Sequence, residues 1–246
     1  HRTKALCDYN SMIDTNKIIF FTGAPGSKWS GTSVLLANTP VIDINISDRT
    51  PEREYDHGPQ FNGVKHMGAY FGPGFEFGEW FHELYTGKYT REQVIAEIES
   101  AYPEHDGYII VKCHQFVYSL DWIAETFPES KIMIVMRHPE ACWDGWHGVG
   151  GIKIPYPDYT TFYKTTEQAK ELINHECMLA RKWIYERDLA VHTSTPRHWR
   201  DVWKLDDADE NRQYNHSLIG YHNKNDKPTE RLRYDVQFSY YNFEMI

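Results

Sequence analysis

Apolar positions divide the chain into short continuous runs and longer helical stretches. Two continuous apolar runs, residues 108–112 and 131–136, are separated by a helical stretch at 118–127. A further run at 17–22 ends in a glycine-rich loop. Continuous apolar runs that alternate with helices are typical of a parallel sheet buried on both faces. The pattern therefore predicts an α/β fold with a central, mainly parallel sheet flanked by helices.

Helical spacing is clearest from residue 90 to 102, where apolar residues recur at intervals of three and four. Thr90 and Gln93 have the spacing of a capping box at the start of this helix. A second helix is expected to begin at Pro139, and a long one to cover residues 159–187.

The remaining segments lack a sustained period. Residues 48–89 are rich in glycine, proline, histidine and aromatic residues, which predicts a loop-rich region, with a brief strand before it at 43–46. Residues 188–246 form an irregular C-terminal region with short strands or extended arms. With 246 residues, of which 41% are hydrophobic, the chain is long enough for one full core. We expect a single domain, residues 1–246.

The charge balance narrows the classes of partner. Against 26 basic residues the chain has 35 acidic ones, for a net charge of -9, which argues against binding to nucleic acid or to an anionic membrane. No apolar run approaches the roughly 20 residues of a membrane span, and the first ten residues lack the apolar segment of a signal peptide. The four cysteines lie far apart and are expected to be reduced, so we predict a cytoplasmic protein without a metal site.

The loop after the first apolar run has the composition of a phosphate-binding loop. Gly26 and Gly31 have the spacing of the pattern GxxxxGK[ST], but the lysine position holds Thr32. Main-chain amides and the start of the next helix can bind a phosphate there, with further donors from the Ser30 and Ser33 hydroxyls. Without the lysine that reaches the outer phosphates, ATP or GTP hydrolysis is less expected.

This loop resembles that of the sulfotransferase family, which reads K-S-G-T-T and binds the 5′-phosphate of 3′-phosphoadenosine-5′-phosphosulfate (PAPS). Residues 30–33 match the S-G-T-T part of this motif, while the family's lysine falls on Trp29, with Lys28 one position earlier. The resemblance implies a phosphate-loop fold of the sulfotransferase type. It implies cofactor contacts from Gly26, Ser27, Lys28, Trp29, Ser30, Gly31, Thr32 and Ser33.

A second match is the segment YIIVKCHQF, which resembles the family strand that ends in K-T-H and carries the catalytic histidine. Lys112 and His114 take the matching positions. Because side chains alternate along a strand, these two are expected on one side and Cys113 on the other. A cation beside a base suits sulfuryl transfer, since the base takes the acceptor's proton. A histidine packed at a strand end is the alternative.

A third match follows the run at 131–136. Arg137 resembles the family arginine that binds the 3′-phosphate of PAPS, and a guanidinium suits a phosphate monoester. The family's serine position falls on Gly145, and its acidic position on Ala141. An ion pair of Arg137 with Glu140 or Asp144 is the alternative.

The sequence gives fewer signals for the part of the site that would bind the acceptor. Residues 48–89 are expected to face the acceptor, with the glycines and aromatic rings of 66–80 lining or covering its pocket. The alternative bases are His57, His66 and His82, and the basic residues available for a C-terminal phosphate contact are Lys224, Lys227, Arg231 and Arg233.

Together these matches predict a PAPS-dependent sulfotransferase that acts on a hydroxyl or amine of a small-molecule or glycan acceptor. His114 is the expected base, and Lys112 and Lys28 the groups that stabilise developing charge. The alternatives are a phosphate-loop kinase or hydrolase and a non-catalytic nucleotide-binding descendant. The prediction requires the loop, His114 and Arg137 to face one another, with the Trp29 indole not blocking the phosphate cradle.

Overall fold

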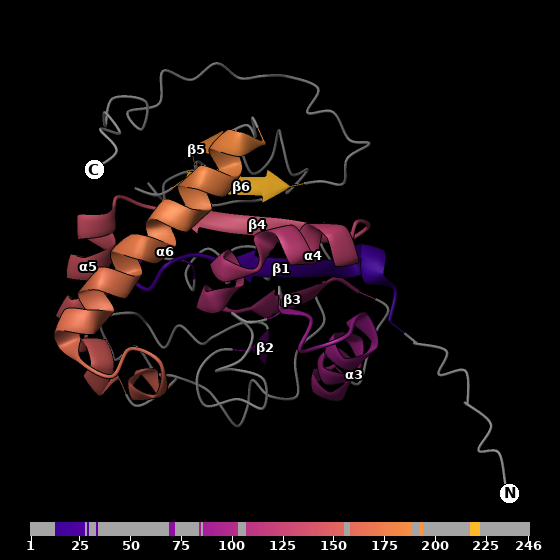
Figure 1. Ribbon diagram of the computed structural model, residues 1–246, viewed down its shortest axis with the longest axis horizontal. Helices are drawn as coiled ribbons and strands as arrows, with labels where there is room; N and C mark the ends of the chain where they lie inside the picture. Colours follow the sequence, from indigo (N-terminus) through magenta and orange to yellow (C-terminus); the bar gives the residue numbers. More distant parts are fainter. Residues whose placement is uncertain are drawn as a thin grey trace, which may run out of the picture.

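The fold is built on a sheet whose central strands are parallel (Figure 1). β1 (Ile18–Thr22) lies between β3 (Ile109–Lys112) and β4 (Lys131–Met136) and pairs with both. All three strands are almost completely buried, which explains their continuous apolar sequences. The predicted α/β class is confirmed. This computed structural model describes residues 13–27, 29, 33, 69–71, 84, 86–102, 107–154, 158–187, 192–193 and 217–221.

Three short strands extend the sheet. β2 (Ala69–Tyr70) pairs parallel with β3, β6 (Ser217–Tyr221) pairs antiparallel with β4, and β5 (His192–Thr193) pairs antiparallel with β6. β2 lies in the segment 48–89, which was predicted to be loop-rich, and its two residues are too short to produce an alternating pattern. The strand predicted at 43–46 lies outside the described residues.

Two helices begin where the sequence predicts them, α3 and α5. α3 (Arg91–Ala101) carries the predicted capping box, in which Thr90 Oγ1 accepts from the Gln93 amide and Gln93 Oε1 accepts from the Thr90 amide. α4 (Leu120–Thr126) connects β3 to β4. α5 (Pro139–Gly148) has proline in its first turn, as predicted.

The long helix begins later than predicted. α6 (Thr166–Glu186) is preceded by a separate 3-10 turn, η6 (Tyr159–Thr161). Between them Lys164 has a φ of 61°, a left-handed conformation that a helix cannot include. Thr165 then caps α6, because its side chain accepts from the Gln168 amide. The prediction of one helix from residue 159 is therefore wrong.

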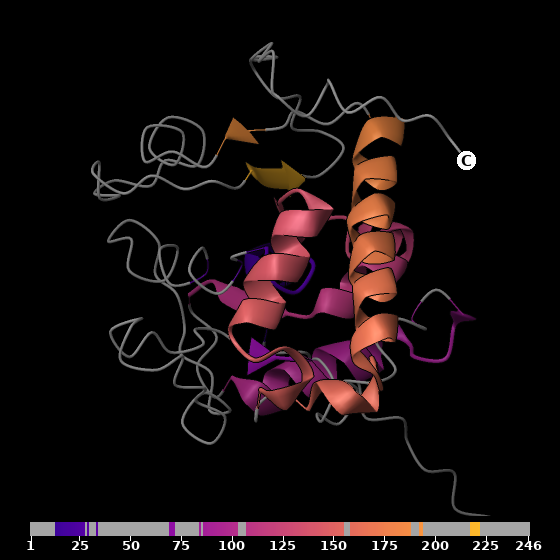
Figure 2. The same ribbon diagram turned by 90° about the vertical axis from the view of Figure 1, so that its left-hand side faces the viewer.

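Two groups of apolar residues hold these elements together. α6 runs along one side of the sheet (Figure 2), and its C-terminal half belongs to one apolar cluster with residues of α3, of α4 and alternate strand residues such as Phe20 and Val111. A second group joins the first half of α6 to α5 and to η6, and it includes Ala24 from the loop after β1. The loop is thus anchored to the α5–α6 pair. Among the helices that the structure describes, none is long and apolar enough to cross a bilayer.

Candidate functional site at the carboxyl edge of the sheet

The predicted site residues follow three neighbouring strands at one edge of the sheet. β1, β3 and β4 are parallel, so the segments after Thr22, Lys112 and Met136 emerge together. Thr22 Oγ1 donates to the His114 carbonyl at 3.3 Å, and Arg137 Nη1 donates to the Gly26 carbonyl at 3.2 Å. The structure therefore brings the start of the loop, His114 and Arg137 to one place.

The start of the loop is a tight turn packed on α5. The Ser27 amide donates to the Ala24 carbonyl at 3.0 Å. Gly26 has a φ of +78°, and a Cβ there would overlap the Cys142 carbonyl of α5. Only glycine fits such a position. The buried Ser27 hydroxyl has no hydrogen-bond partner among the described residues.

His114 is fully buried, and its two ring nitrogens have different partners. Nδ1 is hydrogen-bonded to the Gly23 carbonyl, and Nε2 lies 3.3 Å from the Tyr159 hydroxyl. A carbonyl only accepts, so Nδ1 carries the proton, and Nε2 accepts from Tyr159. Burial lowers the pKa of His114 to about 3, the charge of Lys112 acts in the same direction, and the bond to Gly23 opposes both. The ring is neutral at neutral pH.

Lys112 lies beside His114 and is also fully buried. Its Nζ has no hydrogen-bond partner among the described residues and lies 5.8 Å from the centre of the Trp29 ring. Burial lowers the pKa of Lys112 to about 7. Buried lysines without a partner are rare, because the charged form loses its hydration. Cys113 packs in the main core instead, as the predicted alternation requires.

Trp29 occupies the space between the loop and the strand ends. Its indole is 4% exposed, and its ring centre lies 3.7 Å from that of His114 and 6.3 Å from that of Phe21. The indole therefore covers the imidazole. An acceptor can reach His114 only if Trp29 or Tyr159 moves.

Arg137 contacts the loop rather than a carboxylate. It forms no ion pair with Glu140 or Asp144, both of which the structure describes; Glu140 instead lies 4.0 Å from His138. A Cβ at Gly145 would lie 2.9 Å from Arg137 Nη1, so the absence of a side chain at Gly145 leaves room for the guanidinium.

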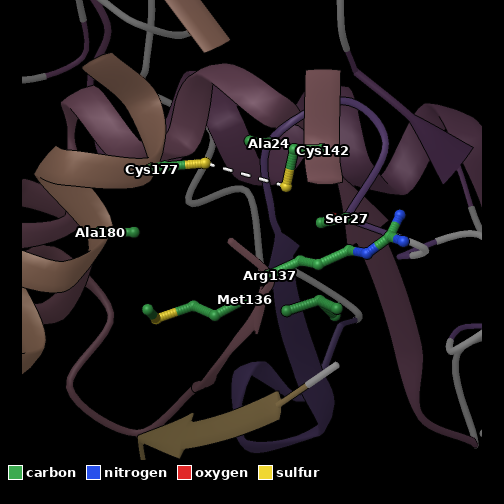
Figure 3. A pocket seen from close by; sticks show the side chains of 8 residues that line it. Ala24, Ser27, Met136, Arg137, Cys142, Cys177 and Ala180 are labelled. Atoms are coloured by element: carbon green, nitrogen blue, oxygen red, sulfur yellow. Dashed lines mark hydrogen bonds between the residues drawn. The ribbon is translucent and has the colours of Figure 1, made fainter. Parts of the chain in front are cut away.

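A small cavity of about 10 Å³ lies beside Arg137, between the loop, β4 and the α5–α6 pair (Figure 3). It has room for about one water molecule, whereas a nucleotide needs roughly 300 Å³ or more. It is lined by Ala24, Ser27, Val135, Met136, Arg137, Cys142, Cys177 and Ala180.

Several predicted residues lie outside the described part of the chain, and Ser33 is described only as buried. In the described ranges no three histidine, cysteine, aspartate or glutamate side chains gather as metal ligands. The residues outside are Lys28, Ser30, Gly31, Thr32, His57, His66, His82, Lys224, Lys227, Arg231 and Arg233.

Two residues that contact His114 were not predicted from the sequence. Gly23 orients the imidazole through its carbonyl, and Tyr159 meets Nε2 from a turn 45 residues further along the chain. The position of Gly23 directly after β1 could have indicated its contact with His114. Nothing in the sequence indicated the contact of Tyr159, because its place depends on how η6 packs.

Comparison with known proteins gives no relative. The chain matches no protein-family model, no curated protein and no solved structure.

Proposed function

We propose that this chain is a PAPS-dependent sulfotransferase with a phosphate-loop fold. The observation that carries the proposal is the buried amino group of Lys112, which has no hydrogen-bond partner among the described residues and lies next to His114. A buried cation without a partner fits an anionic ligand, which would supply the missing hydrogen bonds. The Ser27 hydroxyl, in the loop after β1, is a second buried donor without a partner among the described residues.

The other predicted contacts suit a nucleotide with two separate phosphates. The loop at residues 26–33 would bind the 5′-phosphate, and Arg137 would bind the 3′-phosphate, since its guanidinium pairs with no carboxylate among the described residues. Ligands of open α/β sheets bind at the carboxyl ends of the strands, which is where these groups lie. When bound, PAPS supplies the sulfuryl group and leaves as adenosine 3′,5′-bisphosphate.

His114 would take the proton of the acceptor. Its Nδ1 proton is held by the Gly23 carbonyl, so the Nε2 lone pair is the one available to a hydroxyl or amine. The acceptor would replace the Tyr159 hydroxyl at Nε2. A bound anion beside Lys112 would offset the lysine's charge and raise the pKa of His114 from its buried value, which makes the ring a stronger base.

Calorimetry with adenosine 3′,5′-bisphosphate tests the binding step. In EDTA, we expect binding to the full chain, about 10- to 100-fold weaker binding to Lys112→Met, and unchanged binding to Lys182→Met, whose side chain is 70% exposed. Absence of binding would overturn the proposal. ATP turnover that depends on magnesium would overturn it in favour of a phosphate-loop kinase or hydrolase.

One observation favours a second candidate, a nucleotide-binding protein without catalysis. The Trp29 indole lies 3.7 Å from His114 and covers it. The two candidates differ in a transfer assay with radiolabelled PAPS and phenol, sugar and amine acceptors. If the native chain transfers the sulfuryl group and Trp29→Ala does so faster, the result supports the enzyme. If both proteins bind the bisphosphate and neither shows transfer, the result supports the second candidate.

A further inference from the structure

Two cysteines from neighbouring helices face each other beside the small cavity. Cys142 of α5 and Cys177 of α6 have their sulfurs 3.9 Å apart (Figure 3), although they are 35 positions apart in the sequence. Both are free thiols. The third described cysteine, Cys113, lies in the main core, where its thiol donates to Gln115 Oε1 at 3.2 Å. The three described cysteines thus comprise one close thiol pair and one matched control.

The pair is placed for a covalent bond. A disulfide has a sulfur separation of about 2.05 Å, so the two sulfurs need to approach by about 2 Å. α5 and α6 already pack against each other through the same apolar group, which includes Trp146 and Ile173. The two helices are therefore already in contact before the bond forms.

The electrostatic surroundings make the two thiols unequal. The contact with the Cys142 sulfur and the charge of Arg181 lower the pKa of Cys177, while burial opposes them. The contact with the Cys177 sulfur and burial raise the pKa of Cys142. Both residues are buried, and Cys177 is the slightly more exposed one, at 6% against 0% for Cys142. The thiolate is the nucleophile in disulfide formation, so Cys177, the thiol with the lowered pKa, is the expected attacking group.

We propose that Cys142 and Cys177 form a redox-active dithiol that a peroxide oxidises to a reversible disulfide between α5 and α6. The Cys177 thiolate attacks the peroxide, the O–O bond breaks, and a sulfenic acid and one water form. The Cys142 sulfur then attacks the Cys177 sulfur, the S–S bond forms, and the sulfenic oxygen leaves as a second water. Two thiols lose two electrons and two protons, and one hydrogen peroxide becomes two waters.

The test uses the full chain, first reduced and then treated with equimolar hydrogen peroxide. Mass spectrometry should show a loss of 2 Da, and digestion should give one linked peptide pair that contains Cys142 and Cys177. A thiol reductant should reverse both changes. Because the bond closes a loop of about 35 residues, the midpoint of thermal unfolding should rise by about 5 °C or more.

Variants separate this pair from the other cysteines. Cys113→Ser should still lose 2 Da, whereas Cys142→Ser and Cys142→Ala should instead give a Cys177 sulfenic acid, 16 Da heavier, that reacts with dimedone. Thermal unfolding of each reduced variant shows that it is folded before treatment. The proposal is overturned if the native chain gains oxygen without losing 2 Da, or if the linked peptides contain Cys113 or Cys7.

Discussion

Glu176 and Lys112 are both fully buried ionisable residues, but their surroundings differ. Glu176, in the middle of α6, accepts hydrogen bonds from the Tyr163 hydroxyl at 3.0 and 3.1 Å and from the Tyr118 hydroxyl at 3.5 Å. Lys112, at the end of β3, has no hydrogen-bond partner for its Nζ among the residues that the structure describes. Burial raises the pKa of Glu176 and lowers that of Lys112 to about 7.

The difference shows how to tell a structural polar group from a binding group. The hydrogen bonds of Glu176 are supplied by the fold, so its carboxyl group has partners without any ligand. Lys112 lowers stability as long as it is unpartnered, and a bound anion would remove that cost. A destabilising group is typical of a functional site rather than of a core.

The largest effect is expected from His114→Asn, which removes the proposed base beside Lys112 but keeps the side-chain hydrogen bond to the loop. Asparagine can still donate to the Gly23 carbonyl, but it has no Nε2 lone pair. The rate of sulfuryl transfer should fall by about 10²- to 10⁴-fold, while calorimetry should show bisphosphate binding unchanged within about twofold.

His138→Asn is the matched control for this change, because His138 follows β4 at the same edge and its Nδ1 lies 4.0 Å from Glu140 Oε2. It should leave transfer unchanged. Full activity of His114→Asn would remove His114 as the base.

The second largest effect is expected from Lys112→Met on stability. The pKa of Lys112 is depressed on folding from 10.5 to about 7, so stability present above pH 10.5 is lost as the pH falls towards 7, by about 1.4 kcal/mol per pH unit. Lys112→Met should lack this slope and be more stable than the native chain at pH 7, by about 2–4 kcal/mol in urea unfolding.

Added bisphosphate should reduce that difference, because it stabilises the native chain more than the variant. Lys182→Met, on the exposed side of α6, should keep the native slope. A Lys112→Met variant less stable than the native chain at pH 7 would show that Lys112 is satisfied within the fold, and the contrast with Glu176 would disappear.

Glu176→Gln tests the other half of the contrast, with a smaller effect. The folded pKa of Glu176 is raised, so its contribution to stability is complete below pH 4.5 and is lost as the pH rises. Glutamine keeps an acceptor for Tyr163 and has no charge to bury. Relative to the native chain, the variant should gain up to about 1.4 kcal/mol per pH unit above pH 4.5 in urea unfolding.

Bisphosphate affinity should not change in Glu176→Gln, since this carboxylate is satisfied by tyrosines. Glu186→Gln, at the exposed end of α6, is the control and should keep the native pH dependence. A loss of nucleotide binding in Glu176→Gln would mean that α6 takes part in the site.

The smallest effect is expected from Tyr159→Phe. The acceptor must replace the Tyr159 hydroxyl at His114 Nε2, so removal of that hydroxyl should raise kcat/KM by about 2- to 10-fold, the equivalent of one net hydrogen bond. Tyr163→Phe is the control, because its hydroxyl bonds to Glu176 instead. A lower kcat/KM in Tyr159→Phe would show that the tyrosine positions the base rather than occupying the acceptor's place.

Much of the fold could be predicted because its signals are local. The buried strands β1, β3 and β4 appear as unbroken apolar runs, and the capping box at Thr90 fixes the start of α3. The start of α6 was predicted wrongly because Tyr159 and Phe162 extend its apolar stripe, although the left-handed Lys164 separates them from the helix. A backbone conformation at one residue outweighs a favourable side-chain pattern there.

For the site, sequence order predicted which residues lie near one another but not how each is surrounded. Parallel strands deliver Gly26, His114 and Arg137 to one edge, and this follows from the order of apolar runs and motifs. The sequence did not predict that Trp29 would cover His114 or that Tyr159 would meet its Nε2. Those contacts depend on how the loop and η6 pack.

The sequence by itself determined the α/β class, the positions of the buried strands and the polar residues that follow them, because each depends on neighbours along the chain. Only the tertiary structure decided that Lys112 has no hydrogen-bond partner in the described part of the fold, that Glu176 has two tyrosine donors, and that Cys142 meets Cys177. Burial and hydrogen bonding involve segments far apart in the sequence, so they are fixed only when helices and strands pack together.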